Sequence, residues 1–130
     1  MAGAEQAKAG GRRSEEGSLF AREAARLMQD RHCTDVLLLD LTGISQVCDY
    51  IVIGSGTSDR QMRSVSEEIG KLGKDTGYTW CRTNSDPSST WIVVDFIDVV
   101  VHLFEPSRRA YYDLEDLWSD ARQVEFAQQG

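Results

Sequence analysis

The sequence lacks any hydrophobic run long enough to cross a bilayer, and it holds little cysteine and histidine. A spanning helix needs about 20 consecutive apolar residues, so a membrane-spanning protein is excluded. Of the 130 residues only three are cysteine, Cys33, Cys48 and Cys81, and no two of them form a Cys-x-x-Cys pair. This spacing argues against a disulfide framework and favours a reducing compartment. His32-Cys33 is the only adjacent pair of metal-ligand types, so we expect no metal and no cofactor.

Positive charge is also scarce. The chain has 14 Lys and Arg against 21 Asp and Glu, which gives a net charge of −7 and a pI near 4.7. All of the excess negative charge lies after residue 31. Because phosphate contacts dominate nucleic-acid affinity, this balance disfavours direct binding to RNA or DNA. An acidic surface suits a basic protein partner, although the same charge also serves solubility.

The length and the composition along the chain predict a single domain between two loose ends. Residues 1–17 have no apolar stretch, which excludes a secretory signal, and their acids Glu5, Glu15 and Glu16 are unlike a transit peptide. We therefore expect a disordered tail over residues 1–17, a domain over 18–124, a loose tail over 125–130, and a cytoplasmic protein.

The hydrophobic pattern predicts an α/β layered domain, with a single mixed sheet of about five strands flanked by helices. Expected helices cover residues 18–31, 58–76 and 110–121, and expected strands cover 36–39, 50–53, 79–81, 90–95 and 99–104. Ser58 followed by Gln61 fits a capping box, and Gly77 fits the residue that ends a helix.

Two groups of residues invite a catalytic interpretation. Gly54–Ser58 lies between a strand and a helix, where helix N–H groups could meet a phosphate, but it matches no P-loop and also fits a tight turn. Asp40, Asp49, Asp95 and Asp98 stand at strand ends. Magnesium chemistry usually needs two acids one residue apart on a strand, so caps of turns are the favoured interpretation of these carboxylates.

Aromatic residues near acids point to binding rather than turnover. His102 has no nucleophile near it in the sequence, so a structural or interface histidine is favoured over a catalytic dyad. The segment Tyr111–Trp118 combines large aromatics with three acids, and Trp91 opens a strand beside a polar loop. Tyrosine and tryptophan are favoured anchors at interfaces. Leu114, Leu117 and Trp118 also fit a face that packs on the sheet.

Five segments together resemble the ribosomal silencing factors, also called the Iojap family. They are Asp35–Asp40, Asp49–Ser58 with Arg60-Gln61, Trp91–Asp95, Asp98–His102 and Arg109–Trp118. The resemblance implies a fold related to nucleotidyltransferases but without their catalytic acids. It also implies binding to the large ribosomal subunit at a basic protein, the fourteenth in the large-subunit naming, on the face that meets the small subunit.

By the same resemblance, the bound factor blocks subunit joining and lowers translation when nutrients are short, with no enzymatic step. Family members also form homodimers. Carried over by position, the partner-facing candidates are Trp91, Asp95, Asp98, His102, Arg109, Tyr112, Glu115 and Trp118. Two alternatives remain open, an adaptor for another basic protein and a nucleotidyltransferase-type enzyme. Binding of a nucleoside triphosphate with magnesium would distinguish the latter.

Two segments depart from the family pattern. The turn between the last two strands reads Asp95-Phe96-Ile97-Asp98, where the family usually carries glycine in the third place. A β-branched residue disfavours a positive φ, so we expect a hairpin wider than a two-residue turn. In the loop before Trp91, residues 82–87 are Arg-Thr-Asn-Ser-Asp-Pro, where the family usually carries Glu-Gly. If this loop touches the partner, we expect a different affinity.

Overall fold

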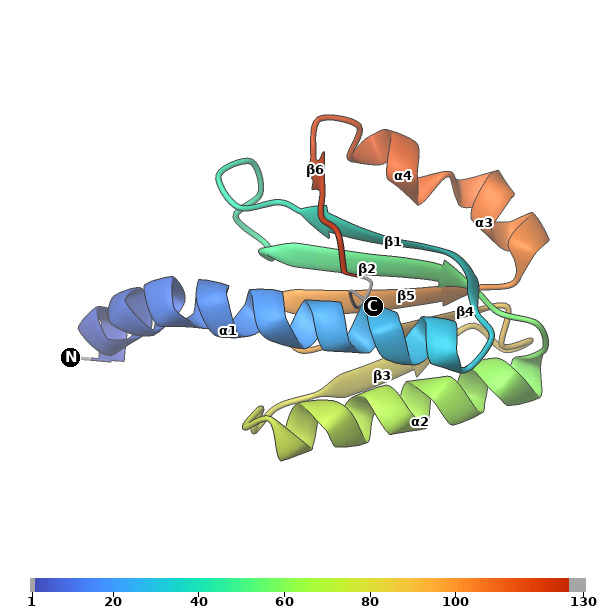
Figure 1. The fold of residues 1–130 in the computed structure, drawn as a ribbon, viewed down its shortest axis with the longest axis horizontal. Helices are drawn as coiled ribbons and strands as arrows, with labels where there is room; N and C mark the ends of the chain where they lie inside the picture. Colours follow the sequence, from blue (N-terminus) through green and yellow to red (C-terminus); the bar gives the residue numbers. More distant parts are fainter. Residues whose placement is uncertain (1, 127–130) are drawn as a thin grey trace.

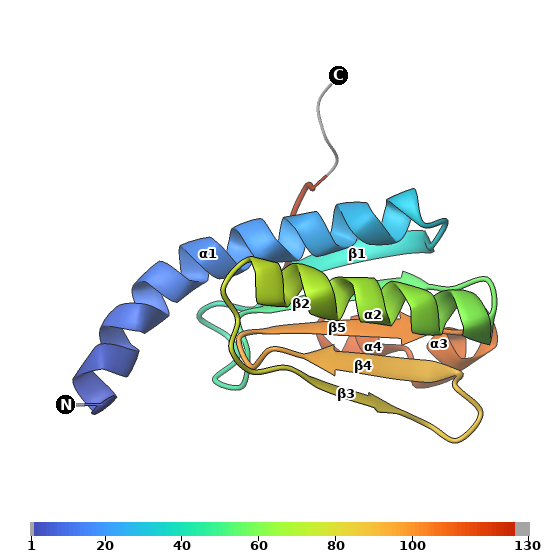
Figure 2. The same ribbon diagram turned by 90° about the horizontal axis from the view of Figure 1, so that it is seen from below.

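The computed structural model describes residues 2–126, with side chains from Glu15 onward except those of Tyr111 and Tyr112. One sheet lies between two helical layers (Figures 1 and 2). The elements in chain order are α1 (Ala2–Asp30), β1 (Thr34–Asp40), β2 (Tyr50–Ser55), α2 (Asp59–Asp75), β3 (Arg82–Ser85), β4 (Trp91–Asp95), β5 (Val99–Phe104), α3 (Pro106–Tyr112), α4 (Leu114–Leu117) and β6 (Arg122–Gln123).

The sheet is mixed, as expected. Its strand order is β3-β4-β5-β2-β1-β6, and β2 and β5 run parallel while the other neighbours are antiparallel. The sixth strand is β6, two residues that pair with Leu39 and Asp40 of β1. Arg122 also reaches Asp40 through an Nη2–Oδ2 contact of 2.8 Å. The sequence did not predict β6, because a strand of two residues is too short to show an alternation of apolar and polar side chains.

Helices α1 and α2 cover one face of the sheet, which Figure 2 shows from the side. Their apolar stripes contribute Phe20, Met28, Met62 and Ile69 to a continuous buried cluster with alternate residues of the strands. Between β2 and α2, Ser58 caps the helix as predicted, because its Oγ accepts from the Gln61 backbone N–H at 3.0 Å. The main core therefore lies between α1, α2 and this face.

The expected disordered tail over residues 1–17 differs from the structure, in which α1 begins at Ala2 and not at Ser18. Residues 2–17 hold four alanines and three glutamates, which favour a helix, against four glycines, which disfavour one. Residues 127–130 of the expected C-terminal tail lie outside the described residues.

Two other expectations need correction. The strand expected at 79–81 lies instead at Arg82–Ser85, where it pairs antiparallel with β4. The helix expected over 110–121 is divided into α3 and α4, because Asp113 adopts a left-handed φ of 49°. Aspartate tolerates this conformation better than most residues, so it ends α3 without a glycine.

Candidate functional site

The sheet face opposite α1 and α2 is only partly covered. Helices α3 and α4 lie on this side (Figures 1 and 2) and pack with residues of β1, β2 and the end of β5. Further along the sheet, Trp91, Val93 and Asp95 of β4 are half-buried, as are Val100 and His102 of β5. The antiparallel register pairs Val93 with His102 and Asp95 with Val100. Because alternate residues share a face, these five side chains form one patch, here called the open face.

Three stacked rings form the centre of this patch. The Trp91 indole lies 5.1 Å from the Phe104 ring, centroid to centroid, with an interplanar angle of 20°. Its Nε1–H donates a hydrogen bond of 3.1 Å to Nδ1 of His102. The Trp91 and His102 rings stack at 6.0 Å and 28°. Both partners of Trp91 hold its indole in one orientation, so it is presented as a rigid aromatic surface.

His102 contributes no positive charge at neutral pH. Burial lowers the pKa of its imidazole to about 4, while the nearby Asp95 carboxylate acts weakly in the opposite direction. A neutral ring is also required by the hydrogen bond, since Nδ1 accepts from the Trp91 indole. The centre of the open face is therefore apolar, and Asp95 supplies the negative charge beside it.

Asp95 stands where β4 ends and also shapes the following turn. Its Oδ1 accepts from the Ile97 backbone N–H at 2.8 Å. Ile97 adopts φ of 79°, and the Asp98 N–H donates to the Phe96 carbonyl at 3.1 Å, which closes a γ-turn. The hairpin therefore has three residues between its strands and is wider than a two-residue turn, as expected, but Ile97 adopts the positive φ that the sequence argument held to be disfavoured for a β-branched residue.

Asp98 does not join Asp95. It is 6% exposed, and one carboxylate oxygen accepts from the Tyr78 hydroxyl at 3.2 Å, on the face that α1 and α2 cover. The two turn carboxylates thus point to opposite sides of the sheet. They do not form the close pair that metal-dependent nucleotidyl transfer requires.

Arg109 is buried and binds within the protein. Its guanidinium lies 2.9 Å from the Glu115 carboxylate through Nη2, and its Nη1 donates to Ser55 Oγ at 3.0 Å. The arginine side chain is 9% exposed and the glutamate side chain 30%. This pair ties α3 to α4 and to the end of β2, so it sets where the helices sit beside the open face.

Trp118 is half-buried and packs against the cluster that α4 covers, while the neighbouring Leu117 is 68% exposed. The side chain of Tyr112 lies outside the described residues. Of the eight predicted partner-facing residues, the structure therefore brings Trp91, Asp95 and His102 into one patch, with Trp118 on the same side of the sheet. Asp98 lies on the other side.

Strand alternation predicts that Val100 shares a face with His102, but neither Val93 nor Val100 was among the predicted partner-facing residues, although both belong to the open face. Strand alternation was the available signal, because each lies two residues from a candidate, Asp95 or His102. Their apolar side chains make the patch continuous from one strand to the next. Without these two valines, the aromatic and charged candidates would not form a continuous surface.

The glycines before α2 serve packing. A side-chain carbon on Gly54 would meet the Met28 methyl at 2.4 Å, and one on Gly56 would meet Met62 at 2.2 Å. Ser55, between them, is buried. The tight-turn interpretation of this segment is therefore favoured over a phosphate loop. Within residues 2–126 no cluster of three or more metal-ligand side chains occurs, and no helix is apolar and long enough to span a membrane.

Comparison with known proteins places these features in a family. The family described as "Ribosomal silencing factor during starvation" matches residues 14–130. "Ribosomal silencing factor RsfS" of Bacillus subtilis is 40% identical over 98 residues, covering 75% of this chain and 83% of its own length. "Mitochondrial assembly of ribosomal large subunit protein 1" of mouse is 31% identical over 101 residues, covering 72% of this chain and 42% of its own.

Solved structures agree with the fold. A crystal structure of a Chromobacterium violaceum protein has a TM-score of 0.71 and 28% sequence identity, with 88% of this chain and 92% of that chain covered. A Bacillus halodurans structure has a TM-score of 0.65 and 33% identity, covering 78% and 92% respectively. The predicted layered α/β fold is thus confirmed both by the structure and by its neighbours.

Proposed function

Because the chain belongs to the ribosomal silencing factor family, we propose that it represses translation by occupying the large ribosomal subunit. The open face is the docking surface in this proposal. Its target is a basic protein on the intersubunit side, the fourteenth of the large subunit. A bound factor then excludes the small subunit by steric overlap, which needs occupancy and no turnover. The proposal places the protein in the cytoplasm.

The observation that carries this proposal is the stacked Trp91 and His102 pair with Asp95 on the same face. A rigid indole buries a large area at little entropic cost, which is typical of an interface anchor. A carboxylate at the edge forms charge-assisted hydrogen bonds with lysine or arginine. An acidic chain also speeds encounter with a basic partner.

Arg109 and Glu115 act differently in this proposal. Since they bind each other, their contribution is to hold α3 and α4 beside the open face. Trp118, which follows α4, packs against the same buried cluster as Trp91. Self-association is part of the proposal too, because the outer edge of β3 pairs with no strand in the described chain and edge strands can pair between copies. Sedimentation velocity of the free protein tests it.

The experiment uses separated ribosomal subunits. Purified protein is added, magnesium is restored, and both co-sedimentation and subunit joining are followed on a sucrose gradient. We expect the protein to travel with the large subunit and free subunits to persist. A protein that stays at the top of the gradient at low salt, where charge attraction is strongest, would contradict docking. Binding with normal joining would contradict steric exclusion.

Three variants locate the docking surface. Trp91→Ala is expected to weaken binding about 30-fold, the effect of losing an anchor worth about 2 kcal/mol. Asp95→Asn is expected to weaken it about tenfold, because asparagine keeps an oxygen for the Ile97 N–H and loses only the charge. Trp80→Ala is the matched control, since it removes an indole from the opposite side of the sheet. Equal losses in Trp80→Ala and Trp91→Ala would overturn the assignment.

A further inference from the structure

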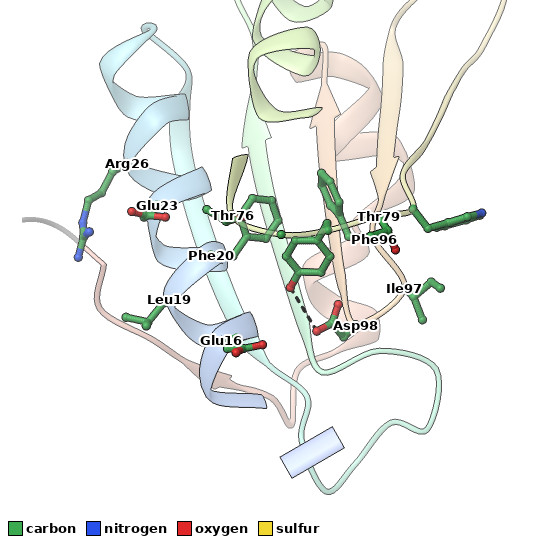
Figure 3. A pocket seen from close by; sticks show the side chains of 13 residues that line it. Glu16, Leu19, Phe20, Glu23, Arg26, Thr76, Thr79, Phe96, Ile97 and Asp98 are labelled. Carbon is green, nitrogen blue, oxygen red and sulfur yellow. Dashed lines mark hydrogen bonds between the residues drawn. The ribbon is translucent and has the colours of Figure 1, made fainter. Parts of the chain in front are cut away.

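A cavity of about 480 Å³ lies on the helix-covered side of the sheet, away from the open face. It is bounded by α1, by the segment that follows α2 and by the β4–β5 turn (Figure 3). Its size falls within the range of small-molecule sites, about 300–1,000 Å³. Nothing in the proposed ribosome docking makes use of it.

One wall of the cavity is aromatic. The Phe20 ring lies 4.8 Å from Tyr78 and 4.7 Å from Phe96, centroid to centroid, so three elements meet in one ring cluster. Trp80 lines the same cavity and is 45% exposed. Aromatic faces carry negative partial charge, and a cation placed over one is stabilised. Phe20 and Phe96 are each 2% exposed, so Tyr78 and Trp80 supply the aromatic surface that an apolar stem and a positive group could reach.

Three further lining residues carry carboxyl groups. Glu16 and Glu23 lie on α1, and Asp98 lies across the cavity in the turn (Figure 3). Arg26 is the one cation among the described lining residues, and its Nε donates to the Phe126 backbone carbonyl. Three carboxylates thus face a cavity whose single cation is already engaged.

We propose that this cavity binds an organic ammonium group carried on an apolar stem. The stem packs against Tyr78 and Trp80, the lining aromatic residues that are not fully buried, and the ammonium group lies among the carboxyl groups of Glu16, Glu23 and Asp98. The same chemistry occurs in a free polyamine and in a lysine side chain of a partner protein. Either source would bind by the same contacts.

Two probes separate the sources. Spermidine represents the free amine, and a capped Leu-Lys-Leu peptide represents the protein side chain. 1,8-Octanediol has a similar length without charge and serves as the negative control. Binding is read from amide chemical shifts of Gly77 and Thr79 and from the indole N–H of Trp80. Shifts confined to these residues are expected with at least one cationic probe and not with the diol.

A matched pair of variants tests the role of charge. Glu23→Gln removes a carboxylate that lines the cavity. Glu67→Gln makes the same change at an exposed position of α2 that does not line the cavity. We expect about tenfold weaker binding for Glu23→Gln and no change for Glu67→Gln. Both positions are exposed, so neither variant should unfold the protein.

The outcomes are decisive in each direction. Binding of spermidine alone assigns the cavity to a free amine, and binding of the peptide alone assigns it to a partner's lysine. No shift with either probe at millimolar concentration would overturn the proposal. Equal binding of the diol, or an equal loss in Glu67→Gln, would overturn it as well. No ribosome is present in this test, so its failure leaves ribosome docking unaffected.

Discussion

The two faces of the sheet differ in how completely they are covered. On one face α1 and α2 bury side chains such as Phe20, Met62 and Ile69 almost entirely. On the other face α3 and α4, of seven and four residues, cover only part of the strands. Trp91 and His102 are left half-buried there. The first face holds the fold together, and the second has apolar surface still available for a partner.

This contrast separates stability from binding. A side chain removed from the covered face loses its contacts in the folded protein alone. A side chain removed from the open face loses less in the free protein and more in the complex. Variants on the covered face should therefore change the free energy of unfolding, and variants on the open face should change the affinity for the partner. Four predictions test this comparison.

The largest effect is expected at Phe20, on the covered face. It is 2% exposed and contacts Tyr78 and Phe96. Phe20→Ala should lower the free energy of unfolding by about 3–5 kcal/mol, because it removes a ring and leaves a void. Urea denaturation measures this change. Trp91→Ala on the open face is the comparison, and a larger loss there would reverse the roles of the two faces.

The next effect is expected at Arg109, which fixes the partial cover of the open face. Arg109→Ala should lower the free energy of unfolding by about 2–3 kcal/mol, below the full value for a buried pair since the Glu115 side chain is 30% exposed. Urea denaturation measures it. Arg63→Ala removes an exposed pair with Asp59, and its effect should be under about 1 kcal/mol. A loss of that small size in Arg109→Ala would contradict a positioning role.

A smaller effect depends on pH and involves His102. Its folded-state pKa of about 4 lies below the usual 6.5, so the unfolded chain binds the proton more readily. Stability is therefore full above pH 6.5 and falls as the pH drops toward 4, by up to about 2 kcal/mol at pH 5.

Thermal melts between pH 7 and 4.5 test this dependence. His102→Gln should flatten the profile in that window, because glutamine does not titrate. An unchanged slope in His102→Gln would show that the imidazole is not the group responsible.

The smallest effect is expected in the turn that joins the two faces. Ile97 has φ of 79° and is 53% exposed, so its side chain gains little burial in a strained conformation. Ile97→Gly should raise the free energy of unfolding by about 1 kcal/mol, since glycine adopts positive φ without strain. Ile44→Gly, at a similarly exposed site of ordinary φ, should not stabilise. Chemical denaturation compares the two, and destabilisation of both would show that Ile97 carries no strain.

Much of the fold could be predicted from local pattern. The start of α2 followed from Ser58 and Gln61, and the β4–β5 hairpin followed from two β-rich runs around a turn without glycine. Prediction failed where a strand was too short to alternate, as in β6, and it placed the start of the first helix at Ser18 where the structure has Ala2. At the site, residue types suggested Trp91, Asp95 and His102. Their separation from Asp98 could not be read from the sequence, because a single residue with positive φ decides which way each carboxylate points.

The fold class and the family of the protein follow from local sequence patterns. The spacing of apolar residues and the helix-capping residues are local signals that span a few positions of the chain. They therefore specify helices and strands, and the order of these elements indicates a layered α/β domain. The acidic balance and the five matched segments indicate the ribosomal silencing family. Three features came only from the packing of distant elements: which sheet face α1 and α2 bury, that Arg109 binds Glu115, and that the rings of Trp91, His102 and Phe104 lie beside one another. These contacts join residues from different elements, and only the packing of those elements brings them within reach.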